Sequence, residues 1–323
     1  MLRLTTPGHL RFNQAAQFEV SFGGAEANVA VMIAQLGGSA EFVTRLPDND
    51  IARRALDELR ALGVGISNAA RGGDRIGVYF LEQGASQRAG KVIYDRAQSA
   101  MAQAKSGDFD WAQIFDGATW FHWSGITPAL SASAANLCAE ACVAARARGL
   151  TVSFDLNFRS KLWSHERAGA VLSPFMRNID LCVTSREEAA AVFGIETNPQ
   201  SASRDEEAAR KLREKFGFKH VALTQREAST ANETRWSAML LTDNEVCSSR
   251  RHEITIVDRV GAGDSFTGAL IFAMRRGDPG EKALEFAVAA SALKHTISGD
   301  YNLVTLDEVE ALAAGGDGGR VRR

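Results

Sequence analysis

The chain has 323 residues, of which 45% are hydrophobic and 24% are charged, and its formal net charge at pH 7 is −2. This length and composition are typical of a soluble globular protein with a large α/β core. The near-neutral charge provides no strongly basic surface, and no apolar run is long enough to cross a membrane. We therefore expect neither a nucleic-acid partner nor a membrane partner.

The N-terminal part of the chain predicts a small sheet inserted into an α/β unit. Its strand-like runs are residues 17–22, 75–82 and 91–96. In the first run, Phe18, Val20 and Phe22 alternate with other residues and share one face of a half-buried strand. Residues 39–46 predict another strand and residues 48–62 a helix. A small sheet inserted near the start of an α/β domain could act as a lid over a site.

From about residue 108 the chain alternates between strands and helices. The predicted strands are 118–123, 150–156, 179–183 and 220–224, and the predicted helices are 131–148, 187–193 and 205–216. This alternation predicts a parallel sheet with helices on both faces, whose ligands bind beyond the carboxyl ends of the strands. A hairpin follows, with strands 235–242 and 245–250 and its turn at Asp243-Asn244, and then helices 265–276, 281–296 and 305–314. The Gly- and Arg-rich tail 315–323 predicts disorder.

Four cysteines, Cys138, Cys142, Cys182 and Cys247, are scattered along the chain. Cys138 and Cys142 are one helical turn apart, but no other pair of cysteines or histidines completes a set of metal ligands. We therefore expect buried, reduced thiols and a cytoplasmic location.

The stretch Asp258–Thr267 is the strongest candidate for chemistry. Gly261 and Gly263 come directly before Asp264, and an apolar helical run follows. Such a loop leaves backbone N–H groups free at a helix start, where an anion is favoured, and Asp264 could act there as a base. The alternative is a glycine turn with an aspartate cap. The spacing does not fit a dinucleotide-binding fingerprint, because Phe266 occupies the position of the third glycine.

A second helix start, Gly23-Gly24-Ala25-Glu26-Ala27-Asn28, has the same character. Small residues and an asparagine at this place suit the close approach of a polar ligand. Tight packing of the helix explains them equally well.

Polar side chains in two other places point to an acidic ligand. Asn157 and Arg159 follow the strand 150–156, together with Asp155, and the alternative there is a surface turn. Tyr79, Tyr94 and Arg96 lie in the predicted lid strands, where the alternative is a solvated sheet face. Two arginines at one pocket, Arg96 and Arg159, favour an acidic substrate over a neutral sugar, because the guanidinium fork matches a carboxylate.

Glu187 and Glu188 follow the strand 179–183. Acidic residues in the first turn of a helix are expected from the helix dipole alone. At the carboxyl end of a strand they could also orient Mg²⁺ through water.

Taken together, these stretches resemble the ribokinase-like (PfkB) family of carbohydrate kinases over nearly the whole chain. Residues 258–266 resemble its C-terminal signature, and Gly23-Gly24-x-x-x-Asn28-x-Ala30 resembles its N-terminal one. Residues 77–82, 93–100 and 155–163 are most similar to members that act on 2-keto-3-deoxygluconate. The resemblance implies a three-layer α/β/α fold with a mostly parallel central sheet and a small β lid. The core would be 23–72 and 97–314, and the lid 1–22 and 73–96.

The resemblance also implies roles for individual residues. Asp264 would be the general base, and the backbone N–H groups of Gly261, Ala262, Gly263 and Asp264 would form an anion hole for the transferred phosphoryl group. The residues implied to contact the sugar acid are Gly24, Asn28, Tyr79, Tyr94, Arg96, Asn157, Arg159 and Asp300, with Arg159 on its carboxylate. Those implied on the nucleotide side are Ser185, Thr224, Asp258, Gly261 and Gly263. The implied cofactors are ATP, Mg²⁺ held by Glu188 through water, and a monovalent cation beside Asp258.

Three features depart from the family pattern. The chain starts after the position of the core strand with which family members usually begin, which suggests a truncated start. Ser185 stands where an Asn-x-x-Glu motif has its asparagine, although Glu188 is kept. The predicted loop Thr224–Ser229 lacks the glycine that family members carry near the nucleotide.

The resulting hypothesis is ATP-dependent phosphorylation of 2-keto-3-deoxygluconate to its 6-phosphate. The alternatives are a ribokinase-like kinase of a neutral sugar or a nucleoside, and a catalytically weak sensor of sugar acids with the same fold. From the resemblance we also expect a homo-oligomer, either a dimer through the lid or a larger assembly.

Overall fold

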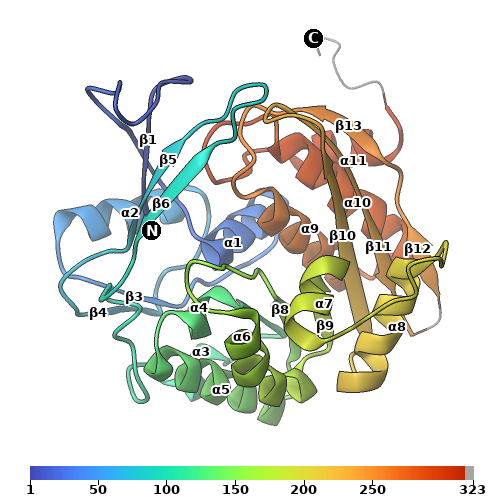
Figure 1. Cartoon of the computed structure of the whole chain (residues 1–323). Coiled ribbons are helices and arrows are strands. Elements are labelled where there is room, and N and C mark those ends of the chain that lie inside the picture. Colours follow the sequence, from blue (N-terminus) through green and yellow to red (C-terminus); the bar gives the residue numbers. More distant parts are fainter. Residues whose placement is uncertain (244, 317–323) are drawn as a thin grey trace.

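The computed structural model describes residues 1–243 and 245–316. At its centre is a mixed sheet whose strands are β7 (Trp120–Ser124), β8 (Thr151–Asp155), β9 (Leu181–Thr184), β10 (His220–Ala228), β11 (Glu233–Leu241), β12 (Val246–Ser248) and β13 (His252–Thr255). The strand order is β12-β11-β10-β9-β8-β7, and β13 also pairs with β11 (Figure 1). The strands from β7 to β10 are parallel, and the pairs that involve β11 are antiparallel.

Helices cover both faces of this sheet. On one face lie α5 (Ala132–Ala147), α6 (His165–Leu172), α7 (Arg186–Phe193) and α8 (Arg204–Phe216), and on the other lie α1 (Ala25–Gln35), α9 (Ala262–Arg276), α10 (Gly280–Lys294) and α11 (Leu306–Ala313). Strand β9 shows why two cores form, because Leu181 and Val183 belong to one core and Cys182 to the other. An apolar strand that alternates between two cores requires helices on both sides. The expected three-layer arrangement is confirmed.

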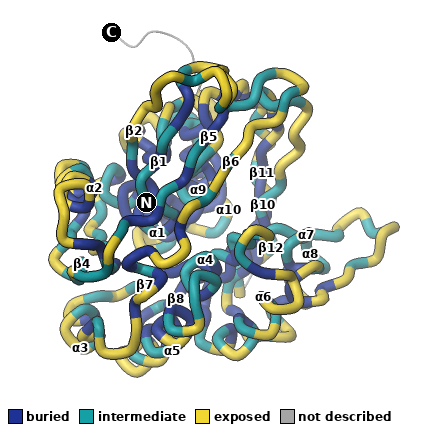
Figure 2. Tube along the Cα trace, turned by 60° about the vertical axis from the view of Figure 1, so that its left-hand side comes forward, coloured by how far each residue is buried: buried dark blue, intermediate teal, exposed yellow. Residues whose placement is uncertain are grey.

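A second, four-stranded sheet stands apart from the central one (Figure 2). Its strands are β1 (Leu2–Thr5), β2 (Glu19–Phe22), β5 (Val78–Glu82) and β6 (Lys91–Asp95), in the order β2-β1-β5-β6. The three strand-like runs predicted in this part of the sequence all contribute to it, and β1 adds a strand that periodicity did not predict. In the sequence between β2 and β5, the chain also forms helix α2 (Asp50–Ala61) and a small parallel pair of strands, β3 (Thr44–Leu46) with β4 (Ala69–Arg71).

One face of this second sheet differs from the sequence expectation. Phe22 is buried at 2% exposure, but Val20 is 44% exposed and Phe18 is exposed as well. The three side chains were expected to share a half-buried face. That expectation is wrong for Phe18 and Val20, because among the described residues no layer of helices covers this part of the outer face.

The largest error in the predicted elements concerns β10. The sequence predicts that this strand ends at Thr224 and that a loop follows to Ser229. In the structure the strand continues to Ala228, because Arg226 and Glu227 pair with Trp236 and Arg235 of β11. A polar run that gains strand hydrogen bonds from a distant segment cannot be recognised from local pattern.

Several short elements were not predicted. They are helices α3 (Trp111–Ile114) and α4 (Ile126–Ala129), helix α6, the 3₁₀ helix Ser173–Asn178, and strands β4 and β13. The expected strand 39–46 shortens to β3. The predicted hairpin is confirmed as β11 with β12, although Asn244 of its turn lies outside the described residues, as do residues 317–323 of the predicted disordered tail. Within the described residues, all helices are too short or too polar to span a membrane.

Candidate active site

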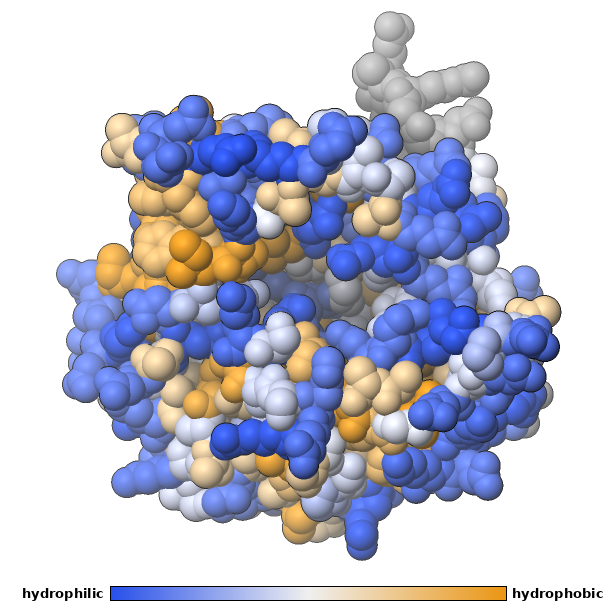
Figure 3. Space-filling view, viewed as in Figure 1, coloured by the Kyte–Doolittle hydropathy of each residue, from blue (hydrophilic) through white to orange (hydrophobic). Residues whose placement is uncertain are grey.

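A cavity of about 700 Å³ lies between the four-stranded sheet and the carboxyl ends of β8, β9 and β10. Figure 3 shows the recess that opens beside the sheet. The predicted site residues that line it are Gly24, Asn28, Tyr79, Tyr94, Arg96, Asn157, Arg159, Ser185, Glu188, Thr224, Gly261, Ala262, Gly263, Asp264 and Asp300. Asp258 does not line the cavity and is buried beneath it. Segments from all parts of the chain therefore meet at one place.

The start of α9 forms the floor of the cavity. Ser265 makes the first intrahelical bond, from its N–H to the carbonyl oxygen of Gly261 at 2.8 Å. In the part of the chain that the structure describes, the N–H groups of Gly263 and Asp264 have no acceptor. Unpaired N–H groups and the positive end of the helix dipole together favour an anion at this point.

The two glycines of this stretch have different reasons to be glycine. Gly261 has φ of 84°, and a Cβ there would lie 2.0 Å from the carbonyl oxygen of Asp300, so backbone packing excludes a side chain. A Cβ on Gly263 would meet nothing within 4 Å, and that residue faces the cavity. Gly261 therefore serves the fold, whereas Gly263 keeps space open for a ligand.

Asp264 is bonded to the other predicted helix start. Asn28 of α1 donates from Nδ2 to Asp264 Oδ2 at 2.7 Å, and its Oδ1 accepts from the N–H of Gly24 at 3.2 Å. Burial raises the pKa of Asp264 to about 7, while the Asn28 hydrogen bond and the charge of Arg159 oppose that rise. The negative charges of Asp300 and Glu26 add to it. A carboxylate with a pKa near neutrality is suited to act as a general base.

Two arginines face the same cavity with unused donors. Arg96 is buried, and its guanidinium lies 3.7 Å from the ring centroid of Tyr94. The Nε and Nη2 of Arg96 and the Nε of Arg159 are buried and have no hydrogen-bond acceptor among the described residues. Burial lowers the pKa of Arg96, and the neighbouring charge of Arg159 lowers it further. Buried donors without partners are rare, so this part of the cavity is built for an anion.

Asp155, Asn157 and Arg159 belong to the turn after β8. Asn157 has φ of 41°, a left-handed conformation that asparagine tolerates, and its N–H donates to Asp155 Oδ1 at 3.0 Å. The local turn predicted as the alternative is therefore present, and it also directs these residues to the cavity. Burial raises the pKa of Asp155 well above its usual value, and the charges of Asp264 and Glu188 raise it further.

The side of the cavity formed by β9 and β10 carries the residues expected near a nucleotide. Ser185 caps α7, because its Oγ accepts from the N–H of Glu188 at 3.2 Å. Burial raises the pKa of Glu188, whose Oε2 accepts from Thr184 Oγ1 at 3.4 Å. Among the described residues, no group of three or more His, Cys, Asp or Glu side chains could hold a metal by itself. A metal in this cavity would therefore need ligands from a bound molecule.

Two further arginines line this side and were missed by sequence reasoning. Arg226 was assigned to a loop, but it lies in β10 two residues after Thr224, so both side chains fall on the same face of the strand. Arg259 precedes the α9 start and donates from Nη2 to the carbonyl oxygen of Ala231 at 2.7 Å. If the sequence analysis had extended β10 to Ala228, Arg226 would have been recognised as a residue on the same strand face as Thr224.

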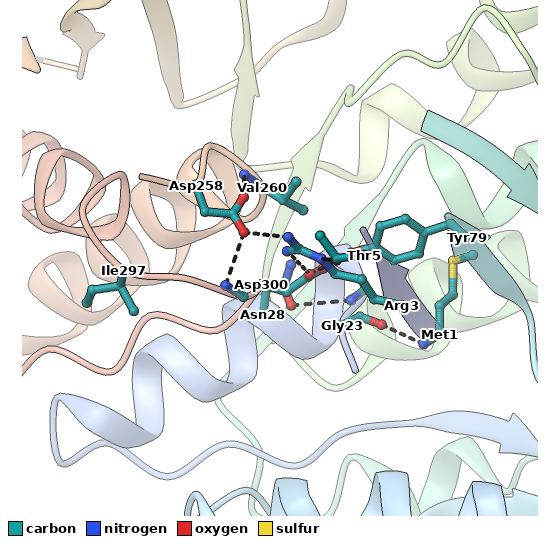
Figure 4. A network of polar contacts seen from close by, with 12 residues as sticks. Met1, Arg3, Thr5, Gly23, Asn28, Tyr79, Asp258, Val260, Ile297 and Asp300 are labelled. Carbon is teal, nitrogen blue, oxygen red and sulfur yellow. Dashed lines mark hydrogen bonds and ion pairs between the residues drawn. The ribbon is translucent and has the colours of Figure 1, made fainter. Parts of the chain in front are cut away.

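Tyr79 and Asp300 reach the cavity wall but bond to each other. The Tyr79 hydroxyl donates to Asp300 Oδ1 at 2.5 Å, and Arg3 Nη1 donates to the same oxygen at 2.9 Å (Figure 4). A Cβ on Gly23 would lie 1.9 Å from Asp300 Oδ2, so the N-terminal glycine pair also packs on this carboxylate. These contacts hold Asp300 in place below the cavity.

Comparison with known proteins places these features in one family. Residues 5–306 match the model of the pfkB family of carbohydrate kinases. A 2-dehydro-3-deoxygalactonokinase from Haloferax volcanii is 35% identical over 99% of this chain and 96% of its own. A 2-dehydro-3-deoxygluconokinase from Thermoproteus tenax is 30% identical over 93% of this chain and 86% of its own.

A solved structure extends the similarity to the whole fold. The crystal structure of 2-dehydro-3-deoxygluconokinase from Thermotoga maritima is 48% identical in sequence and superposes with a TM-score of 0.95, covering 98% of this chain and 96% of that one. The family match spans both helix starts at the cavity and the strands around them. The chain therefore belongs to the pfkB family of carbohydrate kinases.

Proposed function

We propose that the chain transfers the γ-phosphoryl group of ATP to the terminal hydroxyl of 2-keto-3-deoxygluconate, giving the 6-phosphate. The observation that carries this proposal is the pair of arginines, Arg96 and Arg159, in the same cavity as Asp264: some of their donors are buried and have no acceptor within the described part of the chain. A neutral sugar would leave this positive charge uncompensated, whereas a sugar acid brings a carboxylate. The names of the relatives support the same substrate class, since all three are kinases of 2-keto-3-deoxy sugar acids.

Within this proposal, the chain's own residues divide the chemistry among them. Asp264 takes the proton from the substrate hydroxyl, and the N–H groups of Gly263 and Asp264 bind the charge that develops on the phosphoryl oxygens. Arg159 and Arg96 hold the substrate carboxylate and so fix the distance of the hydroxyl from Asp264. When bound, ATP supplies the phosphoryl group and Mg²⁺ offsets the charge of its phosphates.

The nucleotide would lie on the side formed by β9 and β10. Thr224 and Arg226 on β10, and Arg259 beside the α9 start, supply donors and positive charge there. Glu188 would help to hold Mg²⁺ through water, and the ion would offset the negative charge of the nucleotide. Ser185 contributes as the cap of α7, which holds Glu188 in position. Asp258 has no access to the cavity, so the nucleotide contact expected of it has no support in the geometry.

We further propose that the four-stranded sheet is the lid of this site. Arg3, Tyr79 and Tyr94 lie side by side across β1, β5 and β6, and Tyr79 and Tyr94 line the cavity. In this division the lid consists of residues 1–22 and 73–96, which contain the strands of the four-stranded sheet. The core consists of residues 23–72 and 97–314, which contain the strands of the central sheet. A lid excludes water, and water would otherwise compete with the sugar hydroxyl for the phosphoryl group.

We propose that the outer face of the lid joins two copies of the chain. Val20, Leu4, Phe80 and Ile93 are paired in register across all four strands, so they form one apolar row on the face opposite Arg3 and Tyr79. Ile93 is 54% exposed, and a hydrophobic patch covers this sheet in Figure 3. An exposed apolar sheet face of this kind marks an interaction site, and a second copy supplies a matching one.

A cytoplasmic location is our proposal from the cysteines. Cys138, Cys142, Cys182 and Cys247 are all free and buried. Burial raises the pKa of each thiol, which keeps the thiols protonated and unreactive. Free thiols of this kind are typical of a reducing compartment.

The proposed function is tested by an ADP-release assay with a panel of sugars. We expect turnover of 2-keto-3-deoxygluconate, and we include its galactonate epimer because one relative carries that name. Fructose and ribose are the neutral controls. Equal turnover of the neutral sugars and the acids would contradict the substrate class.

The arginines give a direct test of the carboxylate contact. Arg159→Met and Arg96→Met should each raise KM for the sugar acid by roughly tenfold to a hundredfold, because each removes a charge-assisted hydrogen bond. Arg53→Met is the control, since that exposed arginine forms an ion pair with Asp50 on the surface of α2. An unchanged KM in both site variants would refute the assignment of the carboxylate.

Asp264→Asn should lower kcat by about 10²- to 10⁴-fold, as expected for a lost general base, while substrate binding is largely kept. The pKa of about 7 predicts that wild-type kcat/KM falls as the pH drops through 7, because protonated Asp264 cannot accept a proton. Asn28→Ala removes the hydrogen bond that lowers this pKa, so the acidic limb should move to higher pH. A pH profile that is flat across neutrality would exclude Asp264 as the base.

The two glycines of the α9 start should respond differently to alanine. Gly263→Ala places a methyl group in the open cavity, so kcat should fall by about tenfold or more with no loss of thermal stability. Gly261→Ala forces a clash with Asp300, so the midpoint of thermal unfolding should fall. Calorimetry measures the unfolding midpoint and steady-state kinetics measures kcat. Full activity of Gly263→Ala would contradict the idea that Gly263 leaves space for a ligand.

The dimer is tested by Ile93→Asp, which puts a charge in the apolar row. Sedimentation velocity should show a dimer for the wild type and a monomer for this variant. Val143→Asp is the matched control, because Val143 is an exposed apolar residue of α5, away from the lid. A monomeric wild type would overturn the proposal.

A further inference from the structure

Directly below the α9 start lies a buried cluster of two cations and two carboxylates. Its members are Arg3 of β1, Lys294 at the end of α10, Asp258 and Asp300, and none of them is more than 4% exposed. Asp258 is the residue beside which the family resemblance implies a monovalent cation. The contacts of this buried cluster decide whether such an ion fits.

The carboxylate of Asp258 accepts three hydrogen bonds within the protein. Arg3 Nη2 donates to its Oδ2 at 2.5 Å, and the N–H of Gly299 donates to the same oxygen at 3.0 Å. Its Oδ1 accepts from the N–H of Val260 at 3.0 Å. Figure 4 shows Arg3 between Asp258 and Asp300, with both acids on its guanidinium. An added ion would compete with these donors for the carboxylate.

A second cation, the ammonium group of Lys294, lies beside the backbone carbonyl of Asp258. Lys294 Nζ donates to the carbonyl oxygen of Ile297 at 2.9 Å and, at the longer distance of 3.5 Å, to the carbonyl oxygen of Asp258. The C-terminal end of α10 also binds the backbone N–H of Asp258. The carbonyl oxygen of His295, directly after Lys294, accepts from the N–H groups of Val257 and Asp258. Converging backbone carbonyls are the ligands that an alkali cation takes in place of water. Here an ammonium group is bound to them.

The charges of the buried cluster balance without any added ion. Arg3 and Lys294 offset Asp258 and Asp300. Burial lowers the pKa of His295 to about 4, so this neighbour is neutral, and burial keeps Tyr79 protonated by raising its pKa. Burial also lowers the pKa of Lys294, to about 8, with Asp258 and Asp300 opposing the shift, so the ammonium form prevails at neutral pH. A further cation would be a buried, uncompensated charge, which is costly.

We propose that Lys294 takes the place of the monovalent cation, so that the kinase needs no K⁺ or other alkali ion. In this proposal, which rests on the proposed kinase function, Lys294 is a positioning residue. It holds the Asp258 segment, whose next residues form the α9 start. The contact from Ser291 Oγ to the carbonyl oxygen of Ala262, at 2.8 Å, ties α10 to the same turn.

The first test measures wild-type turnover in K⁺, Na⁺ and tetramethylammonium salts at equal ionic strength. We expect kcat values that agree within about twofold, since Lys294 supplies the charge permanently. Activation by K⁺ of roughly tenfold or more, the size of one lost charge-assisted contact, would overturn the proposal. Thermal unfolding in the same salts decides the matter independently of turnover, because a bound alkali ion would raise the unfolding midpoint with K⁺ alone. Absence of turnover in every salt would instead count against the kinase function.

Two variants separate the charge of Lys294 from its packing. Lys294→Met keeps the length and removes the charge, and we expect kcat to fall by about tenfold or more with little change in KM for the sugar acid. Lys294→Ala leaves a hole among the carbonyl groups, and added K⁺ or methylammonium should restore part of kcat and raise the unfolding midpoint. A merely structural lysine would not be rescued by a small cation.

Lys282→Met is the matched control, because this exposed lysine of the same helix forms a surface ion pair with Asp278. We expect it to behave as the wild type does in every salt. Full kcat in a folded Lys294→Met protein, or no rescue of Lys294→Ala by either cation, would overturn the proposal. If neither variant folds, the wild-type salt series still decides it.

Discussion

The hydrogen bond from Asn28 to Asp264 joins two helix starts that are 236 residues apart in the sequence, and the candidate site depends on it. Close packing of α1 on α9 makes the bond possible. A Cβ on Gly268 would lie 2.8 Å from Met32 Cβ and 2.9 Å from the carbonyl oxygen of Val29, so a glycine is needed for this approach. The same bond also affects the carboxylate of Asp264, since it opposes the rise in pKa that burial causes. One contact thus links the fold to the chemistry.

The cavity brings together charged groups of both signs. Arg96 and Arg159 present unpaired donors, while Asp155, Glu188 and Asp264 are carboxylates whose pKa values burial raises. An anionic sugar acid would relieve the arginines, and a metal-bound nucleotide would relieve the carboxylates. Because buried charge is stable only when it is paired, this arrangement favours an anionic ligand at the arginines together with a cation at the carboxylates.

The buried cluster connects the two sheets. Arg3 comes from the four-stranded sheet, and its two acidic partners come from the segments before α9 and after α10. Breaking such a buried pair would leave an unpaired charge, so this pairing ties the four-stranded sheet to the base of the α9 start. Tyr79 of β5 bonds to Asp300 as well, so both inner strands of this sheet, β1 and β5, are tied to the same base.

The sequence alone determined the layered fold and most of the site. Apolar strands alternating with capped helices are a local pattern, and the glycines and Asp264 form a compact motif, so both could be recognised without tertiary contacts. The tertiary structure decided what depends on distant partners. It extended β10 through pairing with β11 and so brought Arg226 to the cavity, it left Phe18 and Val20 uncovered, and it buried Asp258 against Arg3 and Lys294. No local pattern encodes which charges meet in the interior, because that depends on segments far apart in the chain.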